Sequence, residues 1–179
     1  MKLLKTVRAD ASDTFVFDKA AEPGEWAISG AFLFANLDPA TMKGKPRAAF
    51  RGGFLGIGSF GWSTLAQIVE ASEAQRFTAV EQLATRLVEH CGAPDPASAR
   101  AAAQEEIAFA ASLCAHPPGM LIAVSRRHEN EAIRESFRTL QANSRAKPAP
   151  VFSFVEVLGE EETSPERIDL VGLVDRARP

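Results

Sequence analysis

Apolar and polar residues alternate along much of the first seventy or so residues, a pattern typical of half-buried strands. Short strands are predicted at Lys2 to Arg8 and Thr14 to Phe17, separated by a polar turn. A longer strand is predicted from Glu25 to Ala35. Its large apolar residues all fall on one face: Trp26, Ile28, Phe32 and Phe34.

The same alternation continues after a loop at Met42 to Arg47. Ala48 to Leu55 is predicted as a strand, with Phe50 and Phe54 on one face. Thr64 to Ala71 fits two patterns, because its β-branched residues favour a strand while its apolar spacing also fits a helical turn. We favour the strand.

Two helices follow, each with a clear start signal. Ser72 and Gln75 form a capping-box pair, and an apolar stripe continues at helical spacing to Cys91. Asp95 followed by Pro96 is an N-cap with proline in the first turn, and the second helix runs to about Ala115. The short connection between these helices predicts that they lie antiparallel.

The rest of the chain predicts a β-α-β unit. Met120 to Ser125 is expected to be a buried strand, Asn130 to Gln141 a third helix and Val151 to Leu158 a further strand, with a last short strand or tail at Ile168 to Val174. The fold class is therefore α+β, in which an antiparallel-rich sheet packs against a helix hairpin and one further helix.

We predict a single domain built from four sections. Residues 1–71 are mainly β, 72–116 form the helix hairpin, 120–158 form the β-α-β unit and 159–179 form an acidic loop and tail.

Composition narrows the classes of protein. The chain has 179 residues, of which 46% are hydrophobic and 24% charged, as in globular proteins. A net charge of −3 disfavours a nucleic-acid-binding protein, and no stretch has the ~20 apolar residues of a membrane helix. The N-terminal apolar run is too short for a signal peptide, and the only cysteines are Cys91 and Cys114, so we expect a cytoplasmic protein.

The most unusual stretch runs from Arg51 to Ser63, where five of the twelve glycines fall between positions 52 and 61. Glycine permits close approach of another backbone or a ligand. We therefore expect a ligand-binding or partner-binding surface here. Its candidate residues are Arg51, Gly53, Gly56, Gly58, Ser59, Phe60, Gly61 and Trp62.

Gly56 to Gly61 also matches the dinucleotide fingerprint G-x-G-x-x-G, whose backbone amides and following helix hold a pyrophosphate. Its context disfavours that function, because the motif follows antiparallel strands and leads into another predicted strand. A β-bulge or hinge under aromatic side chains is the favoured interpretation. A helix at Thr64 to Ala71 would favour the dinucleotide site instead.

Other arrangements give weaker indications. Ser59 and Ser63 lack the surroundings of a nucleophile, and the three histidines lie at predicted element ends. The two cysteines, each beside or near a histidine, are expected at opposite ends of the helix hairpin. No catalytic residue, no metal site and no cofactor is therefore predicted.

Two charged features remain. Glu106 falls on the alanine-rich stripe of the second helix, where burial would raise its pKa and suit it to act as a general acid or base. The simpler alternative places Glu106 at the edge of the stripe, in contact with water or an arginine.

The segment from Arg126 to Lys147 carries six Arg/Lys against three Glu, and this basic face could bind phosphate or an acidic partner. A solvated face opposite the acidic tail is the favoured interpretation.

Five motifs in order resemble an uncharacterised family of short bacterial proteins, over most of the chain. They are Trp26 to Phe32, Phe50 to Gly56, Ser59 to Thr64, Glu105 to Ala110 and His116 to Gly119. The resemblance implies no activity, cofactor or catalytic residue. It suggests an accessory role with a link to redox-enzyme maturation.

The favoured hypothesis is a non-enzymatic cytosolic accessory or interaction protein with an unknown protein partner. An exposed Phe/Trp face could also form a homodimer. The alternative is a small-ligand or nucleotide-binding enzyme that uses the Gly52–Gly61 loop, together with Glu106 or Arg51.

Overall fold

The computed structural model describes residues 1–8, 11–38, 41–130, 132–141 and 156–157. Its strands form one curled antiparallel sheet in the order β4-β3-β2-β1-β5-β6-β7-β8. They are β1 (Lys2–Val7), β2 (Trp26–Ile28), β3 (Phe54–Gly56), β4 (Trp62–Ser63), β5 (Leu65–Glu70), β6 (Leu121–Glu129), β7 (Ala132–Gln141) and β8 (Glu156–Val157).

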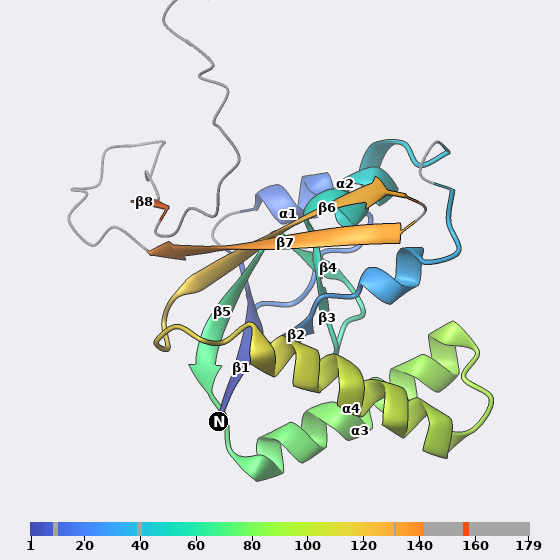
Figure 1. Ribbon diagram of the computed structural model, residues 1–179, viewed down its shortest axis with the longest axis vertical. Coiled ribbons are helices and arrows are strands. Elements are labelled where there is room, and N and C mark those ends of the chain that lie inside the picture. The colour runs from blue at the N-terminus through green and yellow to red at the C-terminus, as the bar shows by residue number, and fades with distance from the viewer. Residues whose placement is uncertain (9–10, 39–40, 131, 142–155, 158–179) are drawn as a thin grey trace, which may run out of the picture.

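The helices are α1 (Ser12–Val16), α2 (Gly44–Gly52), α3 (Glu73–Cys91) and α4 (Pro96–Ser112), with a short 3-10 helix η1 (Ala31–Phe34). In Figure 1, α1 and α2 lie above the β6–β7 pair and the α3–α4 pair lies below it. The α+β class is therefore confirmed. No helix in the described residues is long and apolar enough to cross a membrane.

The α3–α4 hairpin forms as its start signals predict. The Ser72 hydroxyl accepts from the Gln75 amide while the Gln75 side chain accepts from the Ser72 amide, which completes the capping box. The Asp95 carboxylate caps α4, and Gly92 ends α3 in the left-handed conformation. The strand favoured for Thr64 to Ala71 is also confirmed, as β5.

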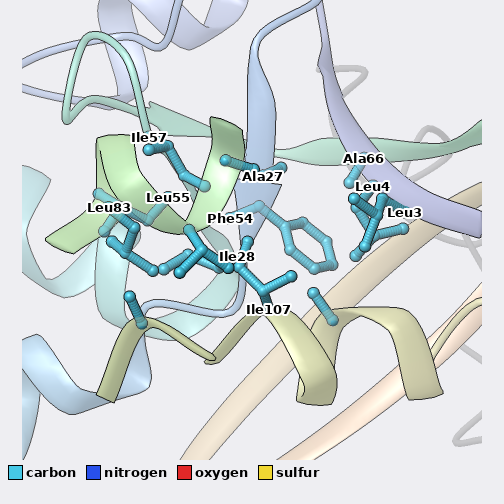
Figure 2. Close-up of a cluster of buried hydrophobic side chains, with 14 of the residues drawn as sticks. Leu3, Leu4, Ala27, Ile28, Phe54, Leu55, Ile57, Ala66, Leu83 and Ile107 are labelled. Carbon is cyan, nitrogen blue, oxygen red and sulfur yellow. The ribbon is translucent and has the colours of Figure 1, made fainter. Parts of the chain in front are cut away.

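The main core lies between this hairpin and the sheet. Leu83 of α3 and Ile107 of α4 are almost completely buried, and Figure 2 shows them beside Ile28 and Leu55 of the sheet. A second cluster packs α1 and α2 around aromatic rings, in which Phe34 meets Phe50 edge-on at 5.3 Å between ring centroids. Burial of these apolar side chains is the main force that holds helices to sheet.

One N-terminal strand prediction is wrong and another is confirmed only in its first part, because local turns and a helix intervene. Thr14 to Phe17 lies mostly in helix α1. The strand expected from Glu25 to Ala35 ends at Ile28, since Gly30 adopts the left-handed conformation at φ 74° and turns the chain into η1.

The strand expected from Ala48 to Leu55 is also wrong, because helix α2 occupies it as far as Gly52. Pro46 stands in the first turn, where proline is tolerated, and the following alanines are good helix formers. Only the last residues of the predicted range, from Phe54, are strand, in β3.

The third helix predicted from Asn130 to Gln141 is wrong as well. This segment is β7, which pairs with β6 from Leu121↔Leu140 to Glu129↔Ala132. Ile133 and Phe137 fit both a helical spacing and an alternating one, and a hairpin at Asn130 (φ 51°) decides for the strand. Of the predicted strand Val151 to Leu158, only β8 is described, and Ile168 to Val174 lies outside the described residues.

Candidate functional site

The glycine-rich stretch is a tight turn between β3 and β4. The Gly56 amide donates to the Gly61 carbonyl at 2.8 Å, and the Phe60 amide donates to the Gly56 carbonyl at 3.0 Å. Phe60 itself has a positive φ of 56°. The turn leads into β4 and not into a helix, so it lacks the helix N-terminus by which a dinucleotide fingerprint attracts a pyrophosphate.

The turn already holds an anion, the side chain of Glu25. One carboxylate oxygen accepts from the Ser59 amide at 2.7 Å, and the other accepts from the Ser59 hydroxyl at 2.5 Å and the Glu22 amide at 2.7 Å. These three hydrogen bonds fix the Glu25 carboxylate inside the turn. Glu25 therefore stands where a bound phosphate would need to be.

This packing explains the glycines. A Cβ atom on Gly56 would lie 2.5 Å from the Glu25 Oε1 atom, and a Cβ atom on Gly61 would lie 2.6 Å from the Ala20 carbonyl oxygen. Neither distance can accommodate a side chain without a shift of the neighbouring group. The close approach that glycine permits is made here to the protein's own atoms.

The aromatic residues of the stretch are also engaged. Phe60 stacks on His90 with 4.9 Å between ring centroids, and Trp62 lies 5.2 Å from the Phe34 ring. Gly53 is buried beneath Trp62, while Arg51 is exposed on α2. The residues predicted to form one binding surface are thus divided between α2, β3, a half-buried turn and β4.

The serines considered as nucleophiles have other partners. Ser59 donates to Glu25, and the Ser63 hydroxyl lies 3.0 Å from the Val7 carbonyl oxygen and 2.8 Å from that of Leu65. Within the described residues neither serine is hydrogen-bonded to a histidine, and no group of three His, Cys, Asp or Glu side chains could hold a metal ion.

A polar cluster lies on the inner face of the β6–β7 pair, centred on Arg126. The Arg126 side chain is completely buried, and its Nε donates to Glu135 Oε1 at 2.7 Å. The Nη1 group donates to the carbonyls of Phe50 at 3.1 Å and Gly53 at 2.8 Å, at the C-terminal end of α2. A cation there satisfies free carbonyls and complements the helix dipole.

Ser29 connects the two charges of this cluster. Arg126 Nη2 donates to the Ser29 carbonyl and, at 3.1 Å, to its hydroxyl oxygen. The Ser29 hydroxyl in turn donates to Glu135 Oε1 at 2.5 Å. Burying an arginine is costly unless its N–H groups find acceptors. Here the acceptors are supplied by Ser29 after β2, by the C-terminal end of α2 and by Glu135 of β7.

Glu106 of α4 stands beside this cluster without joining its hydrogen bonds. Burial, and next the negative charge of Glu135, raise the pKa of Glu106 to about 7, although Arg126 acts in the opposite sense and Glu105 adds a further raising effect. A carboxylic acid with such a pKa can both give and take a proton near neutral pH. Glu106 is therefore a candidate general acid or base.

The apolar spacing of α4 predicts that Glu106 is buried but does not predict which charged residues lie beside it. The helix predicted from Asn130 would separate Arg126 from Glu135, whereas the two residues face each other across β6 and β7. The turn-forming Asn130 between the two segments was the signal that could have indicated a hairpin.

A groove of about 410 Å³ lies between α3 and α4 near their connection. It is bordered by Glu81 and Arg100, which form a two-point ion pair with N–O distances of 2.6 and 2.9 Å. The arginine lowers the pKa of Glu81. The pair joins the two helices and contributes to their packing, and the groove contains no group with the acid–base behaviour of Glu106.

Comparison with known families decides the relationship of this chain. A family of unknown function, DUF6505, has a model that matches residues 1–151. The chain belongs to this family. The match includes the sheet from β1 to β7 and all the described helices, and so agrees with the resemblance drawn from the motifs. No similar curated protein and no similar solved structure was found.

Proposed function

We propose that this DUF6505 protein is a non-enzymatic accessory or interaction protein of the cytoplasm. The observation that carries the proposal is the excess of positive charge on the outer face of the β6–β7 pair. Arg127 and Arg134 lie directly opposite each other there, and both are exposed. Like charges directly opposite each other on a sheet are destabilising, so a partner that neutralises them is a reason for the arrangement.

The glycine-rich stretch gives less support to a ligand site than its sequence suggests. The Ser59 amide and hydroxyl are occupied by Glu25, and the Phe60 and Trp62 rings are packed on their neighbours. Of the two cysteines, Cys91 is exposed and Cys114 is buried. The accessory role and its link to redox-enzyme maturation rest on the resemblance alone.

A photo-crosslinking residue in place of Ser136 tests the proposal. Ser136 lies on the outer face between Arg134 and Arg138, and its hydroxyl donates to the Ser125 carbonyl at 3.3 Å. The full-length variant is expressed in cells that normally make the protein and irradiated. We expect one discrete protein adduct, identified by mass spectrometry.

The matched control carries the same crosslinker in place of Gln82, which is exposed on α3. It should not yield that adduct. The same adducts from both positions, or none from Ser136, would contradict an interaction at this surface.

A second candidate is acid–base catalysis at Glu106, favoured by its pKa of about 7. Native mass spectrometry of the purified protein addresses it directly, because a substrate or product retained by the fold adds a discrete mass. A small molecule lost on Glu106→Gln but kept on Glu105→Gln would favour the enzyme and displace the accessory proposal.

A further inference from the structure

The β6–β7 pair presents two faces of opposite character, because alternate residues of a strand point to opposite sides. Arg126, His128, Glu135 and Phe137 belong to one face, where Phe50 stacks on His128 and Phe109 meets Phe137. The other face has exposed side chains throughout its central part: Ser125, Arg127, Arg134, Ser136 and Arg138. We call this set the arginine face.

The arginine face has more positive charge than the protein neutralises. Arg127 is paired with Glu129 at 3.2 Å, but both side chains are exposed, so this ion pair is weak. Within the described residues, no carboxylate forms an ion pair with Arg134 or Arg138. Of the three guanidinium groups, only that of Arg127 is paired with a described carboxylate.

The arginine face adjoins the edge of β7, where few of the described residues pair with another described strand. On the side away from β6, only Leu140 and Gln141 of β7 pair with another described strand, β8. Residues 132–139 have no described strand on that side. Such an edge carries backbone donors and acceptors that can accept a further strand, as the pairing with β8 demonstrates at one end.

We propose, as a more specific form of the interaction function above, that this edge binds an extended acidic segment of a partner protein as an added strand. Backbone groups of the segment would pair with β7, and its acidic side chains would meet Arg134 and Arg138. These arginines are about 13 Å apart along the strand, so acidic residues four positions apart in the segment would lie opposite them. Arginine is suited to carboxylates because its planar fork makes two parallel hydrogen bonds.

Net charge and composition favour a polypeptide over a nucleic acid as the partner of the arginine face. The chain carries a net charge of −3, whereas nucleic-acid-binding domains are usually basic. The arginine face has no aromatic side chain on which a base could stack. An open strand edge, in contrast, offers nothing to a nucleic acid but is directly useful to an extended peptide.

Fluorescence anisotropy with a labelled peptide tests the proposal on the full-length protein. The probe is a nine-residue peptide in which glutamate alternates with valine and threonine, and its control has glutamine at every glutamate position. We expect the probe to bind and the control peptide to bind at least about tenfold more weakly. Raising NaCl from about 50 to about 300 mM should weaken probe binding several-fold, because exposed charges are screened.

Two double variants locate the site. Arg134→Glu with Arg138→Glu should weaken probe binding at least about tenfold. Lys45→Glu with Arg47→Glu makes the same change in net charge at exposed positions of α2 and should leave binding unchanged. Amide hydrogen exchange in β7 should slow when the probe binds the wild-type protein, because added-strand pairing protects the edge.

Several results would overturn the proposal: equal losses in the two double variants, equal affinity for the glutamine peptide, or displacement of the probe by oligothymidylate at equal charge. A further result would also overturn the proposal. If the probe binds only after Glu160, Glu161 and Glu162 are replaced by glutamine, the arginine face belongs to the chain's own acidic stretch. A crosslinked partner at Ser136 without peptide binding would refute this inference while leaving the interaction function intact.

Discussion

The two faces of the β6–β7 pair use arginine in contrasting ways. On the inner face, Arg126 lies opposite Glu135, and its buried donors meet a carboxylate and the carbonyls at the end of α2. On the outer face, the next residue, Arg127, lies opposite Arg134. The contacts of Arg126 stabilise the fold and so explain its burial. The repulsion between Arg127 and Arg134 weakly destabilises the fold, which indicates that these two residues serve a role outside it.

Removing the inner arginine should have the largest effect on stability. Arg126→Met leaves Glu135 without its cation and several carbonyls without donors, so the free energy of unfolding should fall by about 3–5 kcal/mol. Arg127→Met, one residue away on the outer face, should change it by no more than about 0.5 kcal/mol. Urea denaturation of both variants measures the difference, and equal losses would refute the contrast between the faces.

Glu106→Gln should change how the stability of the protein depends on pH. The folded-state pKa of Glu106, about 7, exceeds its ordinary value of 4.5, so the wild type loses stability as pH rises from about 4.5 to 7. At pH 8 the variant should be more stable by about 1–2 kcal/mol, a value reduced for the carboxylate's partial contact with water. The difference should vanish near pH 4.

Denaturation curves at the two pH values, with Glu105→Gln as the control on the same helix, would measure this difference. A constant difference between Glu106→Gln and the wild type across that range would show that the carboxylate is not desolvated.

Glu135→Gln separates the two causes of the raised pKa. Repulsion from Glu135 contributes after burial, so its removal should lower the pKa of Glu106 toward the ordinary glutamate value without reaching it. Carbon-13 NMR titration of labelled glutamate carboxyls follows this directly. Glu129→Gln, on the exposed end of β6, is the control and should leave the pKa of Glu106 unchanged.

The smallest effect is expected on the outer face. Arg134→Glu turns a like-charge pair with Arg127 into an opposite-charge pair and should stabilise the protein by about 0.5 kcal/mol at low salt. Arg138→Glu should have no such effect, because Arg138 lies opposite Ala123. Thermal unfolding at low and high salt distinguishes them, and a gain that persists in high salt would contradict an electrostatic origin.

The glycine-rich stretch illustrates a limit of motif reasoning. Its spacing correctly indicates close approach of a backbone to another group, but not which group approaches. Glu25, about thirty residues earlier, fills the turn. No local pattern connects these residues, because their contact depends on the pairing of β2 with β3.

The sequence by itself determined the elements whose signals are local. The α3–α4 hairpin, with its capping box at Ser72 and its N-cap at Asp95, forms as predicted because each signal acts within one helical turn. Only the tertiary structure decided that Asn130 to Gln141 is a strand and that Arg126 faces Glu135. Strand pairing and charge burial depend on residues brought together by the whole sheet, and their free energy exceeds the small preference of a single segment.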